Sequence, residues 1–246
     1  MSTSATGGAR FQVSSDQSLL VYFESPSGRR GDKDSRPAKQ ITIEAHEQVR
    51  RFLRLMELEP IAGVRNLHPG YCSVLVKFDA LRLQHFELEE TLRGYLAKMA
   101  KIALPEPQLV EIPVCYGGEY GPDLEDVAER HGMTVKRAIE LHVSATYTVY
   151  FLGFVPGFAY LGELPKELAT PRLPTPRKIV PPGSVGIAGN QTGVYPVATP
   201  GGWRLLGRTP AVMFQPERSE MSLLSIGDRV RFVAISREEF AKLERA

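Results

Sequence analysis

The residues best suited to chemistry gather in one segment of the chain, residues 153–210. This segment contains 10 of the 22 glycines and 10 of the 19 prolines, with six lysines or arginines against two acidic residues. Glycine-rich loops let backbone N–H groups approach a bound molecule closely, and an arginine can donate two parallel hydrogen bonds to one anion. The segment therefore predicts a binding site for a small anion such as a carboxylate or a phosphate. The alternative is that its arginines brace the loops through backbone carbonyls.

Neutral side chains of the same segment suit the rest of such a site. The amide of Gln191 offers a donor and an acceptor, which matches the edge of an amide or lactam. Tyr195 and Trp203 can supply flat apolar walls with polar tips. Only residues 197–199 separate the loop that starts at Gln191 from the turn before Trp203, so the two loops must lie close together. We predict that Gln191, Trp203 and the Pro156–Gly157 turn line one mouth.

His142 admits two interpretations. It lies on the apolar stripe of a predicted helix, seven residues after Val135, where a lone histidine is commonly a core residue. In the second interpretation it ends that helix at the edge of the predicted mouth and takes part in catalysis.

Several common catalytic patterns are missing from the sequence. The phosphate-binding GxxxxGK[ST], the dinucleotide-binding GxGxxG and the GxSxG nucleophile elbow do not occur. Gly183 and Ser184 begin a run that resembles a nucleophile turn but has the wrong spacing. No pair of carboxylates stands in residues 153–210 for glycosidase-type catalysis. Cys72 and Cys115 form no zinc or disulfide pattern, so we interpret both as buried small hydrophobic residues and predict no metal ligands.

Bulk properties exclude several classes of protein. The chain has 246 residues, of which 43% are hydrophobic, a composition that is typical of a globular protein. Its net charge of +2 does not indicate a polyanionic partner such as a nucleic acid. The sequence contains no run of about 18 apolar residues, so no membrane span is predicted. Residues 1–10 contain no apolar core of a signal peptide. We expect a cytoplasmic protein.

The N-terminal elements follow from hydrophobic periodicity. Residues 18–23, 63–66, 71–78 and 109–115 read as strands and residues 43–58 and 88–99 as amphipathic helices, with a polar loop at residues 25–39. The order β-α-β-β-α-β predicts a ferredoxin-like α+β domain. Its boundary falls at the Pro105–Pro107 linker, which gives predicted domains of residues 1–107 and 108–246.

The second domain begins with two short predicted helices near residues 124–128 and 135–142, followed by a strand at 146–151. Residues 153–210 are too rich in glycine and proline to be helical and read as short strands and tight loops of a β-barrel. Later strands are predicted at residues 212–215 and 229–233, and a terminal helix at 238–245. The predicted fold class is α+β.

An ordered set of motifs over about 100 residues carries a resemblance to a known family. The motifs are YFLGFVPGF at 150–158 with YLG at 160–162, PR at 171–172 and 176–177, VPPGSVGI at 180–187, QTGVYP at 191–196, PGGW at 200–203 and GRTP at 207–210. Upstream, PVCYGG at 113–118 and GPDL at 121–124 also match. The chain resembles the family of 5-oxoprolinase B subunits, also called kinase A inhibitor-like (KipI) or allophanate hydrolase subunit 1-like, a carboxyltransferase domain with subdomains C and D.

The resemblance implies a cyclophilin-like β-barrel for the C-terminal domain and a role in an ATP-dependent hydrolase that opens the 5-oxoproline lactam to glutamate. It implies that this chain acts only with partners. One partner would be of the type of allophanate hydrolase subunit 2 or the 5-oxoprolinase C subunit, and a third chain would be of the type of the 5-oxoprolinase A subunit. ATP, with Mg²⁺, would bind to this chain or be shared with a partner. The N-terminal half departs from the family pattern in its long polar loop and at His46.

Candidate site residues follow from the motifs and from the chemistry above. The candidate catalytic residues are His142, Arg172, Arg177 and Gln191. The candidate substrate-binding residues are Phe154, Pro156, Gly157, Phe158, Tyr160, Gly183, Ser184, Tyr195, Gly202, Trp203 and Arg208.

Two other functions stay open at this point. The first is a carboxyltransferase or urea amidolyase component, for which biotin would arrive on another chain because no Met-Lys-Met motif is present. The second is a non-enzymatic regulator that binds a sensor histidine kinase. A proline isomerase would rest on the barrel fold alone.

Overall fold

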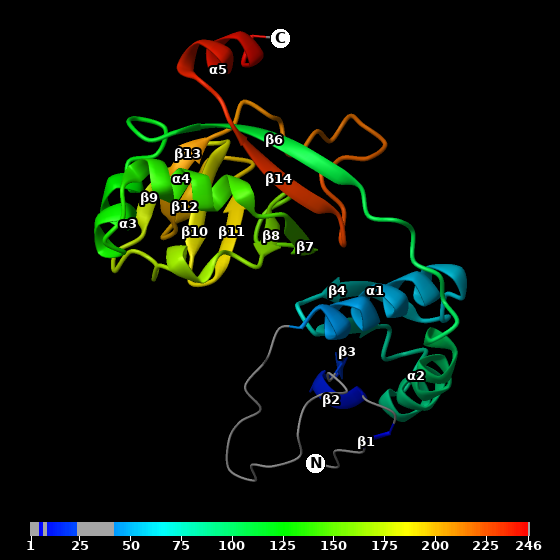
Figure 1. Ribbon diagram of the computed structural model, residues 1–246. Coiled ribbons are helices and arrows are strands. Elements are labelled where there is room, and N and C mark those ends of the chain that lie inside the picture. The colour runs from blue at the N-terminus through cyan, green and yellow to red at the C-terminus, as the bar shows by residue number, and fades with distance from the viewer. Residues whose placement is uncertain (1–4, 7–8, 24–41, 246) are drawn as a thin grey trace. The chain divides into compact units, whose positions relative to one another are not determined.

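The computed structural model describes residues 5–6, 9–23 and 42–245 (Figure 1). The polar loop predicted at residues 25–39 lies outside the described residues. The chain divides into two compact units, residues 1–106 and 107–246, compared with a predicted boundary after residue 107. No helix among the described residues is long and apolar enough to cross a membrane.

Unit 1 is an antiparallel sheet with two helices. The strands are β1 (Ala5–Thr6), β2 (Ala9–Ser15), β3 (Ser18–Phe23), β4 (Val64–Pro69) and β5 (Ser73–Phe78), in the order β1-β2-β3-β5-β4. The helices are α1 (Ile43–Leu58) and α2 (His85–Met99). Thr42 caps α1 by accepting a hydrogen bond from the Ala45 N–H. Phe52 of α1 packs on Phe23 of β3, with ring centroids 5.6 Å apart, so the helix covers the buried face of the sheet.

The ferredoxin-like topology of unit 1 is not confirmed. The strand predicted to close it, residues 109–115, is β6 (Leu109–Tyr116) and pairs with strands of unit 2. The sheet has no place beside β3 for a returning strand, because β3 already pairs with β5 on one side and β2 on the other. β2 was missed in the sequence, and the turn predicted around residues 68–70 comes after β4, at residues 70–72.

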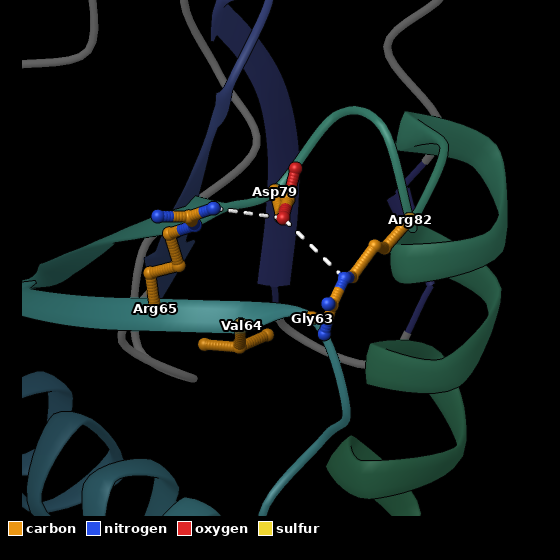
Figure 2. A pocket seen from close by; sticks show the side chains of 5 residues that line it. All are labelled: Gly63, Val64, Arg65, Asp79 and Arg82. Carbon is orange, nitrogen blue, oxygen red and sulfur yellow. Dashed lines mark hydrogen bonds and ion pairs between the residues drawn. The ribbon is translucent and has the colours of Figure 1, made fainter.

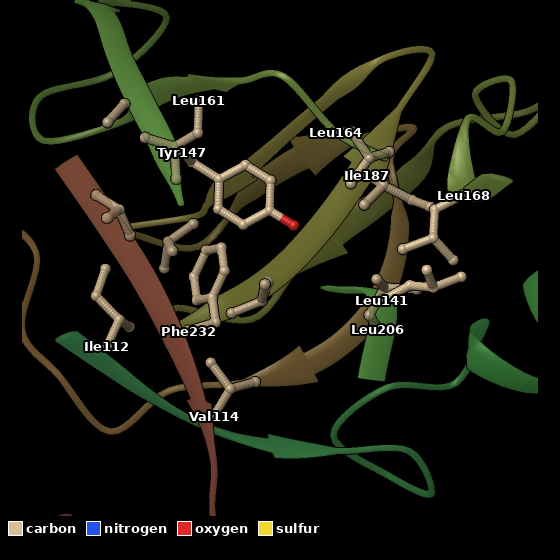
Figure 3. Packing of buried hydrophobic residues seen from close by; sticks show 14 of the residues in the cluster. Ile112, Val114, Leu141, Tyr147, Leu161, Leu164, Leu168, Ile187, Leu206 and Phe232 are labelled. Carbon is tan, nitrogen blue, oxygen red and sulfur yellow. The ribbon is translucent and has the colours of Figure 1, made fainter. Parts of the chain in front are cut away.

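Unit 2 contains the predicted β-barrel. Its strands are β6, β7 (Tyr147–Leu152), β8 (Ala159–Gly162), β10 (Ser184–Ala188), β11 (Gln191–Val194), β13 (Arg204–Arg208) and β14 (Arg229–Ala234). They close in the order β10-β11-β8-β7-β14-β6-β13. The first and last of these strands in the sequence, β6 and β14, pair in parallel over six residues. Tyr147 and Phe232 point into the barrel beside Leu161 and Ile187, and these four side chains are at most 1% exposed (Figure 3).

Short elements complete unit 2. Helices α3 (Leu124–Arg130) and α4 (Val135–Ser144) occur where they were predicted, and α4 adds Leu141 to the barrel core. A two-stranded sheet pairs β9 (Arg177–Val180) with β12 (Thr199–Gly201), and η1 (Lys166–Leu168) is a short 3₁₀ turn. The terminal helix is α5 (Arg237–Leu243). The strand predicted at residues 212–215 is not formed, since only Phe214 makes an isolated bridge, to Ser222.

Candidate functional site

A second hydrophobic cluster lies on the outside of the barrel. Along β11, Thr192 and Val194 face the barrel interior, so Gln191 and Gly193 face outward. The outward surface carries Phe154, Phe158, Tyr160, Tyr195 and Trp203, which we call the aromatic face. Phe158 is its centre, because its ring lies 4.9–5.6 Å from the rings of the other four.

Gly193 makes this packing possible. A β-carbon at this position would lie 3.0 Å from the Ala159 carbonyl oxygen and 3.2 Å from both the Phe158 and Trp203 rings. Because those contacts are tighter than ordinary van der Waals distances, any larger residue would push Trp203 off the strand. The glycine of the QTGVYP motif therefore serves to seat the aromatic face on β11.

The loop 153–158 presents one exposed aromatic ring. The Gly153 N–H donates to the Phe158 carbonyl (3.0 Å) and the Phe158 N–H donates to the Val155 carbonyl (3.1 Å), which closes the loop. Phe154 at its tip has φ 71° and a side chain that is 60% exposed. A bulky residue in this left-handed region costs about 1 kcal/mol or more, and such strain is concentrated at functional positions.

Arg172 is the arginine best placed to meet a ligand. It is exposed, and the described part of the chain gives it no hydrogen bond or ion pair. Burial raises the pKa of Tyr160 and of Tyr195, and the positive charge of Arg172 opposes that rise in both. Arg172 is therefore close enough for its charge to act on two phenols of the aromatic face, and its side chain is open to solvent.

The other arginines have structural partners. Arg177 Nη2 lies 2.7 Å from Asp123 Oδ1, and Asp123 Oδ2 accepts the Leu205 N–H at 2.7 Å. Arg204 donates to the Pro171 carbonyl (3.0 Å) and pairs with Asp126. These contacts favour the bracing interpretation for Arg177 and Arg204.

Arg208 and the residues near it also support the loops. Arg208 Nε donates to the Pro182 carbonyl at 2.8 Å. The Gly183 N–H donates to the Tyr195 carbonyl (2.7 Å), and the Tyr195 N–H donates to the carbonyl of Ser184 (2.9 Å). Ser184 is 2% exposed, which argues against a nucleophile there. Gly183 and Ser184 thus fix the backbone of Tyr195, and Arg208 fixes the neighbouring Pro182. The predicted contact of these residues with a substrate stays a prediction.

His142 lies inside the barrel and not at the edge of a mouth. Its ring is fully buried, stacked on Phe232 with centroids 4.6 Å apart. Nε2 is 3.0 Å from Thr192 Oγ1, and because that hydroxyl donates to the Gly186 carbonyl (3.0 Å), Nε2 must carry the proton. Nδ1 then accepts from the Tyr116 hydroxyl at 2.7 Å. Burial lowers the pKa of His142 to about 3, so the ring is neutral at physiological pH.

The predicted site residues therefore divide. The structure brings Phe154, Phe158, Tyr160, Tyr195, Trp203 and Arg172 together, with Gly202 joined to the same loops through the Leu173 N–H (2.8 Å). Pro156 and Gly157 share the loop of Phe154, and Gln191 faces the same side of β11. His142 does not reach this face. Sequence reasoning missed Asp123 and Asp126, although Asp123 stands within the GPDL motif.

The aromatic face is packed and not hollow. Phe158, Tyr195 and Trp203 are at most 4% exposed, which leaves Phe154 and Arg172 to project from it. A shallow cavity of about 290 Å³ lies in unit 1, where Asp79 binds Arg65 at 2.8 Å and approaches Arg82 at 3.7 Å (Figure 2). Arg65 holds the pKa of the Asp79 carboxyl below its usual range. Among the described residues, no three His, Cys, Asp or Glu side chains are grouped to hold a metal ion.

Comparisons with known proteins agree with these motifs. Residues 10–224 match a family model described as carboxyltransferase domain, subdomain C and D. The 5-oxoprolinase B subunit of Bacillus subtilis (strain 168) is 41% identical over 211 residues, which cover 80% of this chain and 88% of the relative.

Two solved structures show how such chains occur within longer proteins. The crystal structure of TTHA0988 matches 89% of this chain at 33% identity with a TM-score of 0.73, and the chain spans 40% of it. The Kluyveromyces lactis urea carboxylase matches 95% of this chain with a TM-score of 0.70, and the chain spans 22% of it. At 18% identity the second likeness shows the fold alone.

Proposed function

The chain belongs to the family of the carboxyltransferase domain, subdomain C and D, and from that premise we propose that it is the B subunit of a 5-oxoprolinase, which opens a lactam ring at the expense of ATP. The observation that carries the proposal is the exposed side chain of Arg172, whose charge acts on Tyr160, together with the exposed ring of Phe154. A cation next to an aromatic wall suits a small, flat, anionic ring.

5-Oxoproline has the two features that this surface can recognise. Its carboxylate would accept two hydrogen bonds from Arg172. Its five-membered ring would lie against Phe154 and Tyr160, and the Gln191 amide would meet the lactam N–H and C=O. The aromatic residues are already packed against one another, so their arrangement is fixed before the substrate binds.

The chemistry also needs an activated amide. Lactam opening is uphill, and ATP would drive it by transferring its terminal phosphoryl group to the lactam oxygen. A first water would add to the activated carbon and the C–N bond would break, which gives ADP and ring-opened γ-glutamyl phosphate. A second water would then hydrolyse the acyl phosphate to glutamate and phosphate. The Gln191 amide N–H and nearby backbone N–H groups would stabilise the negative charge that develops on the oxygen.

A partner must supply the rest of the site. The aromatic face is one flat wall, and the described residues offer neither a phosphate loop nor a group of carboxylates for Mg²⁺. We therefore assign the ATP phosphates and their Mg²⁺ to a partner chain or to the interface between that partner and this chain. The partner would be of the type of the 5-oxoprolinase C subunit (C-type) or of the A subunit (A-type). The cytoplasm, predicted from the sequence, would provide the ATP.

Reconstitution tests this function. The chain is purified alone and with its A-type and C-type partners, and ADP and glutamate release are measured with 5-oxoproline. We expect turnover only with all partners. Arg172→Ala should lower kcat/KM by about thirtyfold or more, equivalent to about 2 kcal/mol, without a change in Tm. Lys178→Ala removes another exposed cation, on β9, and should leave both unchanged. Turnover by the lone chain, or full activity of Arg172→Ala, would contradict the proposal.

A second candidate is a carboxyltransferase component, because the urea carboxylase of Kluyveromyces lactis contains the same fold. The same arginine would then bind a carboxylate carried on biotin. The assay separates the two functions, since carboxyl transfer from carboxybiotin to urea yields no glutamate.

A further inference from the structure

An exposed apolar surface adjoins the aromatic face. Its residues come from two loops, 153–158 and 211–223. Gly157 of the first loop lies against Met213 and Phe214 of the second, so closely that a β-carbon on Gly157 would be 2.6 Å from Phe214 Cβ. The two loops together expose Phe154, Val212, Met221 and Leu223, whose side chains are 60%, 59%, 50% and 38% exposed. We call these four residues the apolar rim.

The second loop is an ordered hairpin that holds these residues outward. The Gln215 N–H donates to the Met221 carbonyl (2.6 Å), and the Leu223 N–H donates to the Met213 carbonyl (2.9 Å). In Figure 1 it is the orange segment between β13 and β14. Met213 and Leu224 anchor the hairpin in the barrel core, with 2% exposure each. The exposure of Met221 and Leu223 is therefore a property of a fixed structure.

Charged residues border the apolar rim at the tip of the hairpin. Glu217, Arg218 and Glu220 at the tip of the hairpin are all exposed, and a shallow cavity of about 450 Å³ lies between the tip and Leu223. An apolar centre with a polar, mixed-charge border is the composition of a protein interface. Contiguous exposed apolar patches with a polar border mark interaction sites.

We propose that the apolar rim is the docking surface for the partner that completes the site on the aromatic face. The inference rests on the proposed function, and Phe154 links the two because it belongs to both surfaces. Because Gly157 lies against Met213 and Phe214, a partner seated on the hairpin would lie next to the loop that carries Phe154. The occupant is a chain corresponding to the part of TTHA0988 that this chain does not match, since this chain spans only 40% of that protein.

The strained conformation of Phe154 is consistent with this role. Within this chain the Phe154 ring meets the ring of Phe158, yet it stays 60% exposed at a residue with φ 71°. Burial of the exposed part against a partner would offset the cost of that conformation.

Binding measurements test the proposal. The dissociation constant for the purified C-type partner is measured by isothermal titration calorimetry for the wild type, for Met221→Ser with Leu223→Ser, and for Leu81→Ser. Leu81 is the matched control, because it is 97% exposed on unit 1. We expect at least a tenfold weaker affinity for the double variant, an unchanged Tm, and wild-type affinity for Leu81→Ser. If the double variant has a lower Tm, the affinity of Val212→Ser is measured in its place, and we expect the same weakening.

The outcomes separate this inference from the proposed function. Unchanged affinity in the double variant, or an equal loss in Leu81→Ser, overturns the docking surface even when the assembled enzyme is active. Weaker binding in the double variant supports it, even when the wild-type complex releases no glutamate and the proposed function fails. A wild-type chain that dimerises, and becomes monomeric in the double variant, shows that the occupant is a second copy and overturns the proposed partner.

Discussion

The buried imidazole of His142 should make unit 2 lose stability in mild acid. The ring is neutral in the folded chain, where burial lowers its pKa to about 3, whereas an unfolded chain has a histidine pKa of about 6.5. Between these values the unfolded state binds one proton more than the folded state. The contribution of His142 to stability is therefore complete above pH 6.5 and is lost as the pH falls towards 3.

The magnitude follows from the two pKa values. Over the whole interval the loss is about 5 kcal/mol, a large share of the stability of a typical domain. Between pH 7.5 and 5.0, where most carboxylates stay ionised, the loss is about 2 kcal/mol. The ionisable groups against the ring are the phenols of Tyr116 and Tyr147, and burial raises the pKa of both, so neither titrates in this range.

Urea unfolding at pH 5.0, 6.0 and 7.5 measures the effect. Trp203 is the only tryptophan, so its fluorescence reports on unit 2. His142→Gln should be about 2–3 kcal/mol less stable at pH 7.5, because Tyr116 and Thr192 lose partners, but it should lose the acid-dependent slope. His131→Gln is the control, since its ring is partly exposed, and should keep the slope. Equal slopes in the wild type and His142→Gln would refute the reasoning.

Three further substitutions test the packing of the site. Arg177→Ala leaves the carboxylate of Asp123 nearly buried without its ion pair, so we expect about 2–3 kcal/mol of destabilisation and a lower Tm in a thermal melt; an unchanged Tm would show that the pair does not brace the loops. Gly193→Ala should cost about 1–3 kcal/mol and shift the emission of Trp203, and wild-type emission would contradict the close packing. Phe154→Gly should raise the stability of the isolated chain by up to about 1 kcal/mol, because it removes the strain at φ 71°. The same variant should lower turnover in the assembled enzyme. A lower Tm for the isolated variant would argue against strain at this residue.

Local patterns predicted much of the fold. The apolar stripe of residues 43–58 predicted the first helix, because the buried residues of that helix face a single sheet. The glycine and proline content of residues 153–210 predicted the barrel, since such a segment can form only short strands and turns. β2 was missed because most of its residues are polar or exposed, and its pairing with β3 took the place assigned to residues 109–115.

The sequence predicted which of the candidate site residues lie together better than it predicted what each of them contacts. The motifs identified the aromatic face, because a tight turn beside an aromatic residue is visible in sequence. A helical stripe cannot tell whether His142 faces a barrel core or its rim, since both positions are apolar on one side. The partner of Arg177 stands 54 residues away, and no local pattern joins an arginine to so distant an aspartate.

The parallel pairing of β6 with β14 has a consequence for how the protein is made. Glu111 and Arg231, joined across these strands, are 120 residues apart. The barrel therefore stays open on the ribosome until residues 229–234 have emerged. Unit 1, whose strands pair within residues 5–78, can fold well before that. Contacts of such long sequence separation form slowly, so the aromatic face, which is seated on the barrel, is among the last parts of the molecule to be ordered.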